Sequence, residues 1–460
     1  MFNKGVVLCL TVFYFSIIST ALALQKDSER IISENLIVRV DSSSVVQGSF
    51  KVSPDTKRVA YAARTGDKQS VVTDGKGGKP YDGIGSIIFS PDSKRIVYVA
   101  KAGDKMLVVV DGKEGKQYDG IGRDSIIFST DSKRVAYAAK TGDKWLVVMD
   151  GKEQRQYDNT GGVTFSPDSK DIAYGAKLGD KMFVVIDGKE GKAYDGVAEP
   201  VSSPDSQRVA YAAKAGGKWL VVLDGKEGKP YDSINSIIFS PDSERTAYLA
   251  TVGDKMLVVA DGKEQRQYDN MGGLTFSPDS KHVAYGAKLG DKMFVVMDGK
   301  DGKQYDEIAG GSIIFSPDSK RIAYAAFVEG KVFVVMDGEE GKFYDGTGSN
   351  SIIFSPDSKR IAYLAKAGDK MLVVVDGKEG KQYDGIGRDS IIFSPDSKHL
   401  AYGAFLEGRS FLVLDGEEGK AYDGIITSVG GRIIFDSPDT LRYLAVQGSD
   451  VYSVEEKIKR

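Results

Sequence analysis

The sequence predicts an all-β protein made from one repeated unit, and three observations support this prediction. Ser-Pro-Asp or a close variant occurs eleven times, and the motif aspartates from Asp55 to Asp396 recur every 37 or 39 residues. Each unit contains four short apolar runs rich in Val, Ile, Phe and Tyr, which suit strands and are too short for helices. Turn residues separate the runs. A fixed period in this range is typical of repeat architectures.

The elements of one unit can be assigned in chain order. They are a strand at 86–89, the Ser90-Pro91-Asp92 turn, a strand at 96–100, the Gly103-Asp104 turn, a strand at 107–110, the Asp111-Gly112 turn and a strand ending at Tyr118. Pro presets the backbone angle of a tight turn, Asp bonds its own backbone, and Gly allows left-handed conformations. Four strands in about forty residues form the blade of a β-propeller.

The repeat resembles a known family at this point. The segment 239–248, Phe-Ser-Pro-Asp-Ser-Glu-Arg-Thr-Ala-Tyr, is similar to the WD40-like repeat of the periplasmic Tol-system propellers and of propellers attached to prolyl peptidases. The resemblance covers roughly residues 50 to 445 and implies a propeller fold. In those families a Gly usually follows the Asp, whereas Ser or Thr stands here. The resemblance is therefore to the repeat type, and we do not carry over any member's activity.

The chain divides into four expected segments. These are a signal peptide at 1–23, an N-terminal segment with a closing strand at 24–49, ten propeller repeats at 50–431, and a partial repeat at 432–460 that completes the last blade. The closing strand is expected at Leu36–Val40. We favour about ten repeats plus a composite terminal blade in one ring. Two rings split near residue 200, where Ala198–Ser202 replaces the usual strand, and an open array are the alternatives.

The first residues predict export. An apolar stretch from Val6 to Ile18 precedes Ala21-Leu22-Ala23, as in a secretory signal peptide. Cys9 is the single cysteine and lies inside that stretch, so no disulfide is expected afterwards. We expect a periplasmic or extracellular protein, of bacterial origin.

Composition limits the partners. The formal net charge is −3, and acidic and basic residues are mixed within every unit. Neither nucleic acid nor anionic lipid is favoured as a partner, and no membrane span is expected after removal of the signal peptide.

The candidate catalytic residues favour a protein that is not an enzyme. His282 and His399 occupy a slot that holds Arg in most other units and Asp171 in one, which indicates a solvated turn or strand edge. The carboxylates repeat from unit to unit, as turn residues do, whereas a catalytic pair is usually unique. Calcium bound by these oxygens is the alternative; otherwise no cofactor is expected. A recurring lysine, Lys105 and its equivalents, is expected on a solvated face beside the aspartate one residue away.

The position after that lysine varies most. It holds Gln69, Met106, Trp145, Met182, Trp219, Met256, Met293, Val332, Met371 and Ser410. Large side chains here could fill the space between blades. Alternatively, Trp145 and Trp219 could lie on an accessible rim as anchors for a partner, because Trp is enriched in binding hot spots.

Repetition also bears on function. Residues 100–129 and 365–394 are identical, so blocks have been duplicated. A repetitive binding surface tolerates such duplication better than an active site does. We therefore expect a non-enzymatic scaffold that binds protein or a cell-envelope polymer. A polysaccharide-binding or polysaccharide-cleaving protein and a structural surface or matrix component are the alternatives. Departures from the repeat, such as Glu199-Pro200, Phe343 or Arg409-Ser410, would mark a single site.

Overall fold

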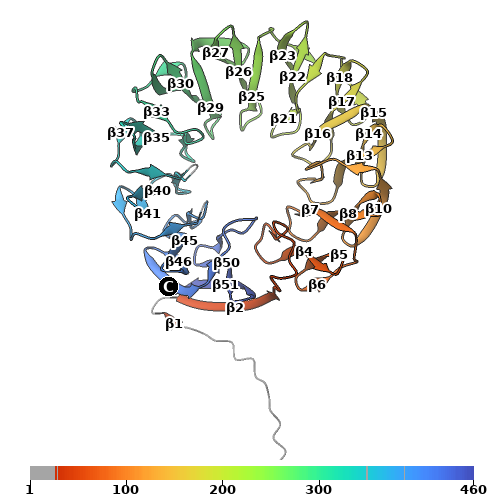
Figure 1. Cartoon of the computed structure of the whole chain (residues 1–460). Coiled ribbons are helices and arrows are strands. Elements are labelled where there is room, and N and C mark those ends of the chain that lie inside the picture. The colour runs from red at the N-terminus through yellow and green to blue at the C-terminus, as the bar shows by residue number, and fades with distance from the viewer. Residues whose placement is uncertain (1–25, 28–29, 349–350, 388, 460) are drawn as a thin grey trace, which may run out of the picture.

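The strands of this chain form a single closed ring of blades (Figure 1). The computed structural model describes residues 26–27, 30–348, 351–387 and 389–459. The predicted signal peptide at 1–23 lies outside the described residues. Within them the strands form eleven sheets, each with a core of four antiparallel strands. The chain does not split near residue 200, and the ring does not stay open.

Blade 2 shows the pattern of a repeat. Its strands are β7 (Gly83–Phe89), β8 (Ile96–Ala102), β9 (Lys105–Val110) and β10 (Lys113–Tyr118), paired in that order. β7 lies nearest the centre of the ring and β10 at its outer edge (Figure 1). Because neighbouring strands are antiparallel, the Ser-Pro-Asp turn and the Asp111-Gly112 turn share one face of the ring, called here the Ser-Pro-Asp face. The Gly103-Asp104 turn and Asp119 share the other, the Tyr-Asp face.

The other repeats use the same plan. Blade 1 contains β3 (Lys51–Val52), β4 (Val59–Thr65), β5 (Lys68–Thr73) and β6 (Lys76–Gly77), and blade 3 contains β11 (Gly120–Ile121), β12 (Ile127–Phe128), β13 (Val135–Thr141), β14 (Lys144–Met149) and β15 (Lys152–Tyr157). Blade 4 contains β16 (Asn159–Phe165), β17 (Ile172–Leu178), β18 (Lys181–Ile186) and β19 (Lys189–Glu190), and blade 5 contains β20 (Gly196–Val197), β21 (Val201–Ser202), β22 (Val209–Ala215), β23 (Lys218–Leu223) and β24 (Lys226–Glu227). Blade 6 contains β25 (Ser233–Phe239), β26 (Thr246–Val252), β27 (Lys255–Ala260) and β28 (Lys263–Tyr268).

Blades 7 to 10 complete the run of repeats. Blade 7 contains β29 (Asn270–Phe276), β30 (Val283–Leu289), β31 (Lys292–Met297) and β32 (Lys300–Asp301), and blade 8 contains β33 (Glu307–Ile308), β34 (Ile314–Phe315), β35 (Ile322–Val328), β36 (Lys331–Met336) and β37 (Glu339–Glu340). Blade 9 contains β38 (Gly346–Thr347), β39 (Ile353–Phe354), β40 (Ile361–Ala367), β41 (Lys370–Val375) and β42 (Lys378–Glu379), and blade 10 contains β43 (Gly385–Ile386), β44 (Ile392–Phe393), β45 (Leu400–Leu406), β46 (Arg409–Leu414) and β47 (Glu417–Tyr422).

The eleventh blade is a full sheet assembled from both ends of the described chain. It contains β48 (Gly424–Ile425), β49 (Ile434–Ser437), β50 (Thr440–Gln447), β51 (Asp450–Ile458), β2 (Arg30–Arg39) and β1 (Lys26–Asp27). β2 lies along the outer edge of β51, where the first and last colours of the chain meet (Figure 1). The ring therefore has eleven blades, where the sequence predicted about ten repeats and a composite terminal blade.

The hydrophobic core lies between the blades. At the joint of blades 2 and 3, Val97 and Val108 pack against Tyr118, Tyr137 and Leu146, all less than 5 % exposed. Burying one such side chain stabilises the fold by roughly 1.5–3 kcal/mol. Tyr118 and Tyr137 meet edge to face, with ring centroids 6.3 Å apart, and similar tyrosine pairs occur at the other repeats. Each blade is thus stable only against its neighbours, as in other repeat proteins.

No helix in the described ranges is long and apolar enough to cross a membrane.

Candidate binding sites at the blade joints

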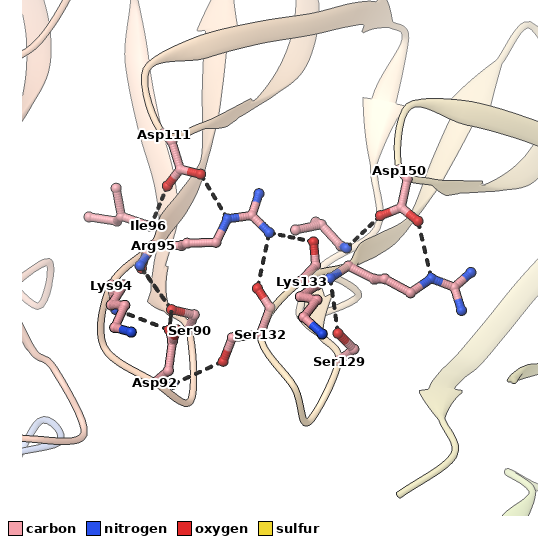
Figure 2. Close-up of polar contacts among 12 residues, drawn as sticks. Ser90, Asp92, Lys94, Arg95, Ile96, Asp111, Ser129, Ser132, Lys133 and Asp150 are labelled. Carbon is pink, nitrogen blue, oxygen red and sulfur yellow. Dashed lines mark hydrogen bonds and ion pairs between the residues drawn. The ribbon is translucent and has the colours of Figure 1, made fainter. Parts of the chain in front are cut away.

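The Ser-Pro-Asp turn holds its own loop and the next blade together. Asp92 Oδ1 accepts hydrogen bonds from Ser90 Oγ (2.6 Å) and from the Lys94 amide (3.1 Å) (Figure 2). The Asp92 amide donates to Ser132 Oγ of blade 3, at 2.9 Å. The bond from Ser90, followed by that from Lys94, lowers the pKa of Asp92. These contacts agree with the predicted turn-making role of the aspartate.

The slot after Ser-Pro-Asp-Ser-Lys is a joint contact, not a solvated edge. Arg95 Nε donates to Asp111 Oδ2 at 2.8 Å, and its Nη1 donates to the carbonyls of Ser132 (3.0 Å) and Lys133 (2.6 Å) of the next blade (Figure 2). Its guanidinium carbon also lies 5.4 Å from the ring centroid of Phe128. The Arg95 side chain is only 29 % exposed. The predicted solvated edge was wrong for Arg95, because two of its partners are carbonyls of the following repeat. It fits His282, whose side chain is 41 % exposed.

Three joints lack the arginine. His282 and His399 bond to Asp298 (2.7 Å) and Asp415 (2.6 Å), within their own blades. At the joint of blades 4 and 5, Asp171 stands in the slot, and a hydrogen bond with Asp187, then burial and repulsion from Asp187, raise the pKa of Asp171. Ser202 occupies the position of Phe128 there. This joint therefore lacks both partners of the arginine–aromatic contact.

The repeated lysine is neutralised on the Tyr-Asp face. Lys105 Nζ pairs with Asp119 Oδ1 at 2.5 Å, and Asp119 Oδ2 accepts a hydrogen bond from the Gly142 amide of the next blade at 2.7 Å. The partner is thus fourteen residues further along and not the neighbouring aspartate. The equivalent pairs are Lys68–Asp82, Lys144–Asp158, Lys181–Asp195, Lys218–Asp232, Lys255–Asp269, Lys292–Asp306, Lys331–Asp345, Lys370–Asp384 and Arg409–Asp423.

A third contact links the outer strands. Glu114 Oε1 accepts hydrogen bonds from Lys79 Nζ and from Tyr81 Oη, both at 2.7 Å. The bond from Lys79 lowers the pKa of Glu114. At the joint of blades 10 and 11, Glu34 of β2 takes the place of Glu114 and binds Lys420 and Tyr422. The N-terminal strand therefore supplies the missing outer contact of the last blade.

The two tryptophans occupy equivalent positions in β14 and β23. Both are half-buried. Trp145 pairs with Lys140 and Tyr157 across the sheet. Trp219 packs against the apolar cluster between blades 5 and 6. A methyl group added to Gly196 would lie 3.6 Å from the Trp219 ring. Packing between blades accounts for Trp219, and partner binding by either residue stays a prediction.

At other joints, the residue at the position of these tryptophans lines a pocket. Met182 and Glu199 line a pocket of about 250 Å³ between blades 4 and 5, and Ser410 lines one of about 200 Å³ between blades 10 and 11. Both lie at departures from the repeat that the sequence singled out as marks of a single site. Phe343, the third departure, is 50 % exposed and contacts Phe333 on its own blade.

Two larger grooves repeat one set of positions. A groove of about 430 Å³ between blades 2 and 3 contains Lys113, Glu114, Tyr137 and Asp150. A groove of about 450 Å³ between blades 4 and 5 contains their equivalents Lys189, Glu190, Tyr211 and Asp224. Both open beside the Ser-Pro-Asp face. Sequence reasoning missed them because each is formed by two successive repeats.

The described part of the chain contains no group of three or more His, Cys, Asp or Glu side chains placed to hold a metal ion.

Comparisons with known proteins assign the chain to no family. No family model and no curated protein matches the chain. Among solved structures, a eukaryotic initiation factor is 13 % identical, with 79 % of this chain and 96 % of that chain covered and a TM-score of 0.39. TolB from Acinetobacter baumannii is 14 % identical (65 % and 79 % covered, TM-score 0.27), and the Niastella koreensis GH74 enzyme is 10 % identical (93 % and 96 % covered, TM-score 0.31). At these values none of them informs function.

Proposed function

We propose that this protein is an exported, non-enzymatic β-propeller that binds a protein or a cell-envelope polymer through a surface repeated around the ring. The observation that carries the proposal is the pair of equivalent grooves on the Ser-Pro-Asp face. Each is lined by a lysine, a glutamate and a tyrosine from the same repeat positions, and the lysine is exposed. A partner that repeats its own chemistry gains avidity from such sites without any new kind of contact.

The state of the carboxylates supports binding rather than catalysis. Hydrogen bonds from Ser90 and Lys105 lower the pKa of Asp92 and Asp119, and their equivalents behave likewise. A general acid needs a pKa raised toward the working pH, so these groups are poorly suited to that role. They hold the ring together and leave the exposed lysines of the grooves available.

Polysaccharide is the second candidate ligand, because Asp187 lines the groove at blades 4 and 5 and interacts with Asp171, whose pKa is raised. A carboxyl group with a raised pKa next to a second carboxyl group is a common arrangement for acid–base catalysis. However, glycosidases separate their carboxyl groups by about 5–9.5 Å, whereas Asp171 and Asp187 are close enough to hydrogen-bond. This geometry favours binding of a polysaccharide over its cleavage.

The test is capture by the mature chain, residues 24–460, from an envelope and secreted extract, with bound proteins read by mass spectrometry and bound polysaccharide by sugar analysis. Charge reversal of Lys113 and Lys189, which lie in the grooves, should reduce capture of the ligand. Reversal of Lys101 on the Tyr-Asp face is the matched control. Replacing Trp145 and Trp219 with Ala tests the rim alternative. Equal capture by the groove variants and the control would overturn the proposal.

A further inference from the structure

The joint between blades 11 and 1 differs from every repeat joint. In β2 of blade 11, Leu36 and Val38 occupy the positions that Lys116 and Tyr118 hold in blade 2. In blade 1, Gly77 occupies the position that Glu114 holds in blade 2. The lysine–glutamate–tyrosine contact therefore has no counterpart here. On the Tyr-Asp face of blade 11, the acidic and basic residues of the repeated lysine–aspartate pair are exchanged. Asp450 stands at the position of the lysine, and Arg39 Nε pairs with Asp450 Oδ1 at 2.7 Å. The arginine contact remains, because Arg442 Nε donates to the Asp55 carbonyl at 3.1 Å and to Thr56 Oγ1 at 3.3 Å in blade 1. Apolar side chains of both blades pack in the rest of the joint.

This packing is incomplete and leaves a pocket of about 580 Å³. Its walls are Val40, Phe50, Ile426, Val429, Val446 and Val451, with Ser42, Gly448 and Ser449 at the edge. Val451 occupies the position of Trp219, so a smaller side chain leaves the space open. Phe50 is fixed by stacking on Tyr61, at 6.1 Å between ring centroids and 13° between planes. Volume and lining match those of ligand sites, which are concave and mostly apolar.

Val429 marks this pocket as more than a packing defect. The loop between β48 and β49 is longer than its counterpart between β43 and β44, and it places Val429 at φ 52°, with 44 % of its surface exposed. A β-branched residue rarely adopts this conformation, which costs energy that the fold must supply. Exposure of an apolar side chain adds a second cost. The Val429 carbonyl accepts a hydrogen bond from the Val52 amide of blade 1 at 3.1 Å, and its side chain lines the pocket.

The charge at the edge of the pocket indicates the ligand. Asp41 is exposed between the lining residues Val40 and Ser42. Its Oδ1 accepts hydrogen bonds from the amide and hydroxyl of Ser43, at 3.0 and 2.6 Å, and within the described residues no cation pairs with it. With Arg39 matched by Asp450, the edge carries one unmatched negative charge. A cation on the ligand complements it.

We propose that this pocket binds a small amphipathic cation, whose apolar chain lies against Phe50, Ile426 and Val429 and whose ammonium group lies beside Asp41. The site shares no lining residue with the two grooves beside the Ser-Pro-Asp face. Binding requires no covalent step. The apolar chain leaves water for a lining that is already formed, and the exposed carboxylate selects the sign of the head group.

The test uses octylamine and octanoate, which share a chain and differ in charge, with affinities measured by calorimetry on the mature chain. Octylamine should bind about fivefold more tightly than octanoate. Asp41→Asn retains an oxygen for Ser43 and should abolish this preference. Equal binding of both compounds, or binding of neither, would overturn the proposal.

Val429→Asn locates the site and separates ligand binding from folding. Asn tolerates φ 52° better than Val, so the urea midpoint should stay equal or rise while octylamine affinity falls about fivefold. Leu289→Asn, at an exposed apolar residue of blade 7, is the control and should leave octylamine binding unchanged. Unchanged binding in Val429→Asn, or a lower midpoint than in the Leu289 control, would show that Val429 serves the fold and not a ligand.

Discussion

Arg95 and its equivalents determine how firmly one blade holds the next. We expect Arg95→Ala to lower the free energy of unfolding by about 1.5–3 kcal/mol, because carbonyls of the next blade and Asp111 lose a charged donor. Arg95→His should cost less, because a histidine in this slot binds the aspartate of its own blade, as His282 binds Asp298. Equilibrium unfolding in urea measures both. Lys94→Ala, at a neighbouring exposed residue, is the control, and equal losses for the His and Ala variants would contradict a stabilising role for the Asp111 contact.

Asp171 should weaken its joint at neutral pH. Its pKa is raised by Asp187, so its protonated form favours the folded state. That contribution is present below the ordinary Asp pKa of about 3.9 and is lost as pH rises through the raised value. Asp171→Asn should therefore raise the urea midpoint at pH 7 and give no gain at pH 3.

A matched residue lies three positions away from Asp171. The pKa of Asp168 is lowered, chiefly by a hydrogen bond from Ser166, so Asp168→Asn should have the opposite effect and lower the midpoint at pH 7. Two variants of the same sign at pH 7 would show that local charge, and not these contacts, sets the stability of the joint.

Residue roles were predictable from the sequence only where the partner lies in the same repeat. The turn role of Asp92 follows from Ser90 and Lys94, two residues away on either side. The role of Arg95 could not be predicted in this way, because its partners at 128, 132 and 133 belong to the next blade. One feature of the sequence could have indicated the contact between Arg95 and the next blade. Asp171 replaces the arginine in the same joint in which Ser202 replaces the phenylalanine, so the two losses occur together.

At the scale of elements, β2 closes the ring through a buried ion pair as well as through its ladder with β51. Arg30 Nη1 pairs with Glu456 Oε2 at 3.1 Å, with side chains 7 % and 0 % exposed, and Tyr443 Oη donates to Glu456 Oε1 at 2.7 Å. Removing one member leaves a buried charge unmatched. Arg30→Met should therefore cost about 3–5 kcal/mol.

The double variant Arg30→Met with Glu456→Gln should recover part of that loss, since a buried pair also costs desolvation. Unfolding in urea, followed by tyrosine and tryptophan fluorescence, measures both variants. If the double variant is no more stable than Arg30→Met, the loss comes from packing and not from the unmatched carboxylate.

The strands themselves were largely predictable, because turn residues mark their ends and β-branched residues fill them. The closing strand expected at Leu36–Val40 lies mostly within β2, which begins earlier, at Arg30. The segment from Arg30 to Asn35 is mostly polar and gives no strand signal by itself. It pairs because β51 presents a free edge, a tertiary cause that a local pattern does not contain.

At the scale of the molecule, repetition explains why ring closure and site position were hard to predict. A repeat pattern sets the blade but not the number of blades that close the ring, since each blade contacts only its neighbours. Three pockets arise where the pattern fails: at Glu199, at Ser410, and at Val429 and Val451. The first two departures were visible in the sequence. The last two lie at a joint that exists only once the ring has closed.

The whole ring should lose stability steeply in acid. Hydrogen bonds from Ser-Pro-Asp serines and from Tyr-Asp lysines lower the pKa of aspartates at nearly every joint, to about 2 for Asp131. A lowered pKa stabilises the fold above the ordinary value of about 3.9, and this stability is lost as pH falls through the lowered value. Because the joints repeat, their losses add. The urea midpoint of the mature chain should be level above about pH 5 and fall sharply between about pH 4 and 2. An unchanged midpoint at pH 3 would mean that apolar packing between blades, and not the aspartate contacts, limits the stability of the ring.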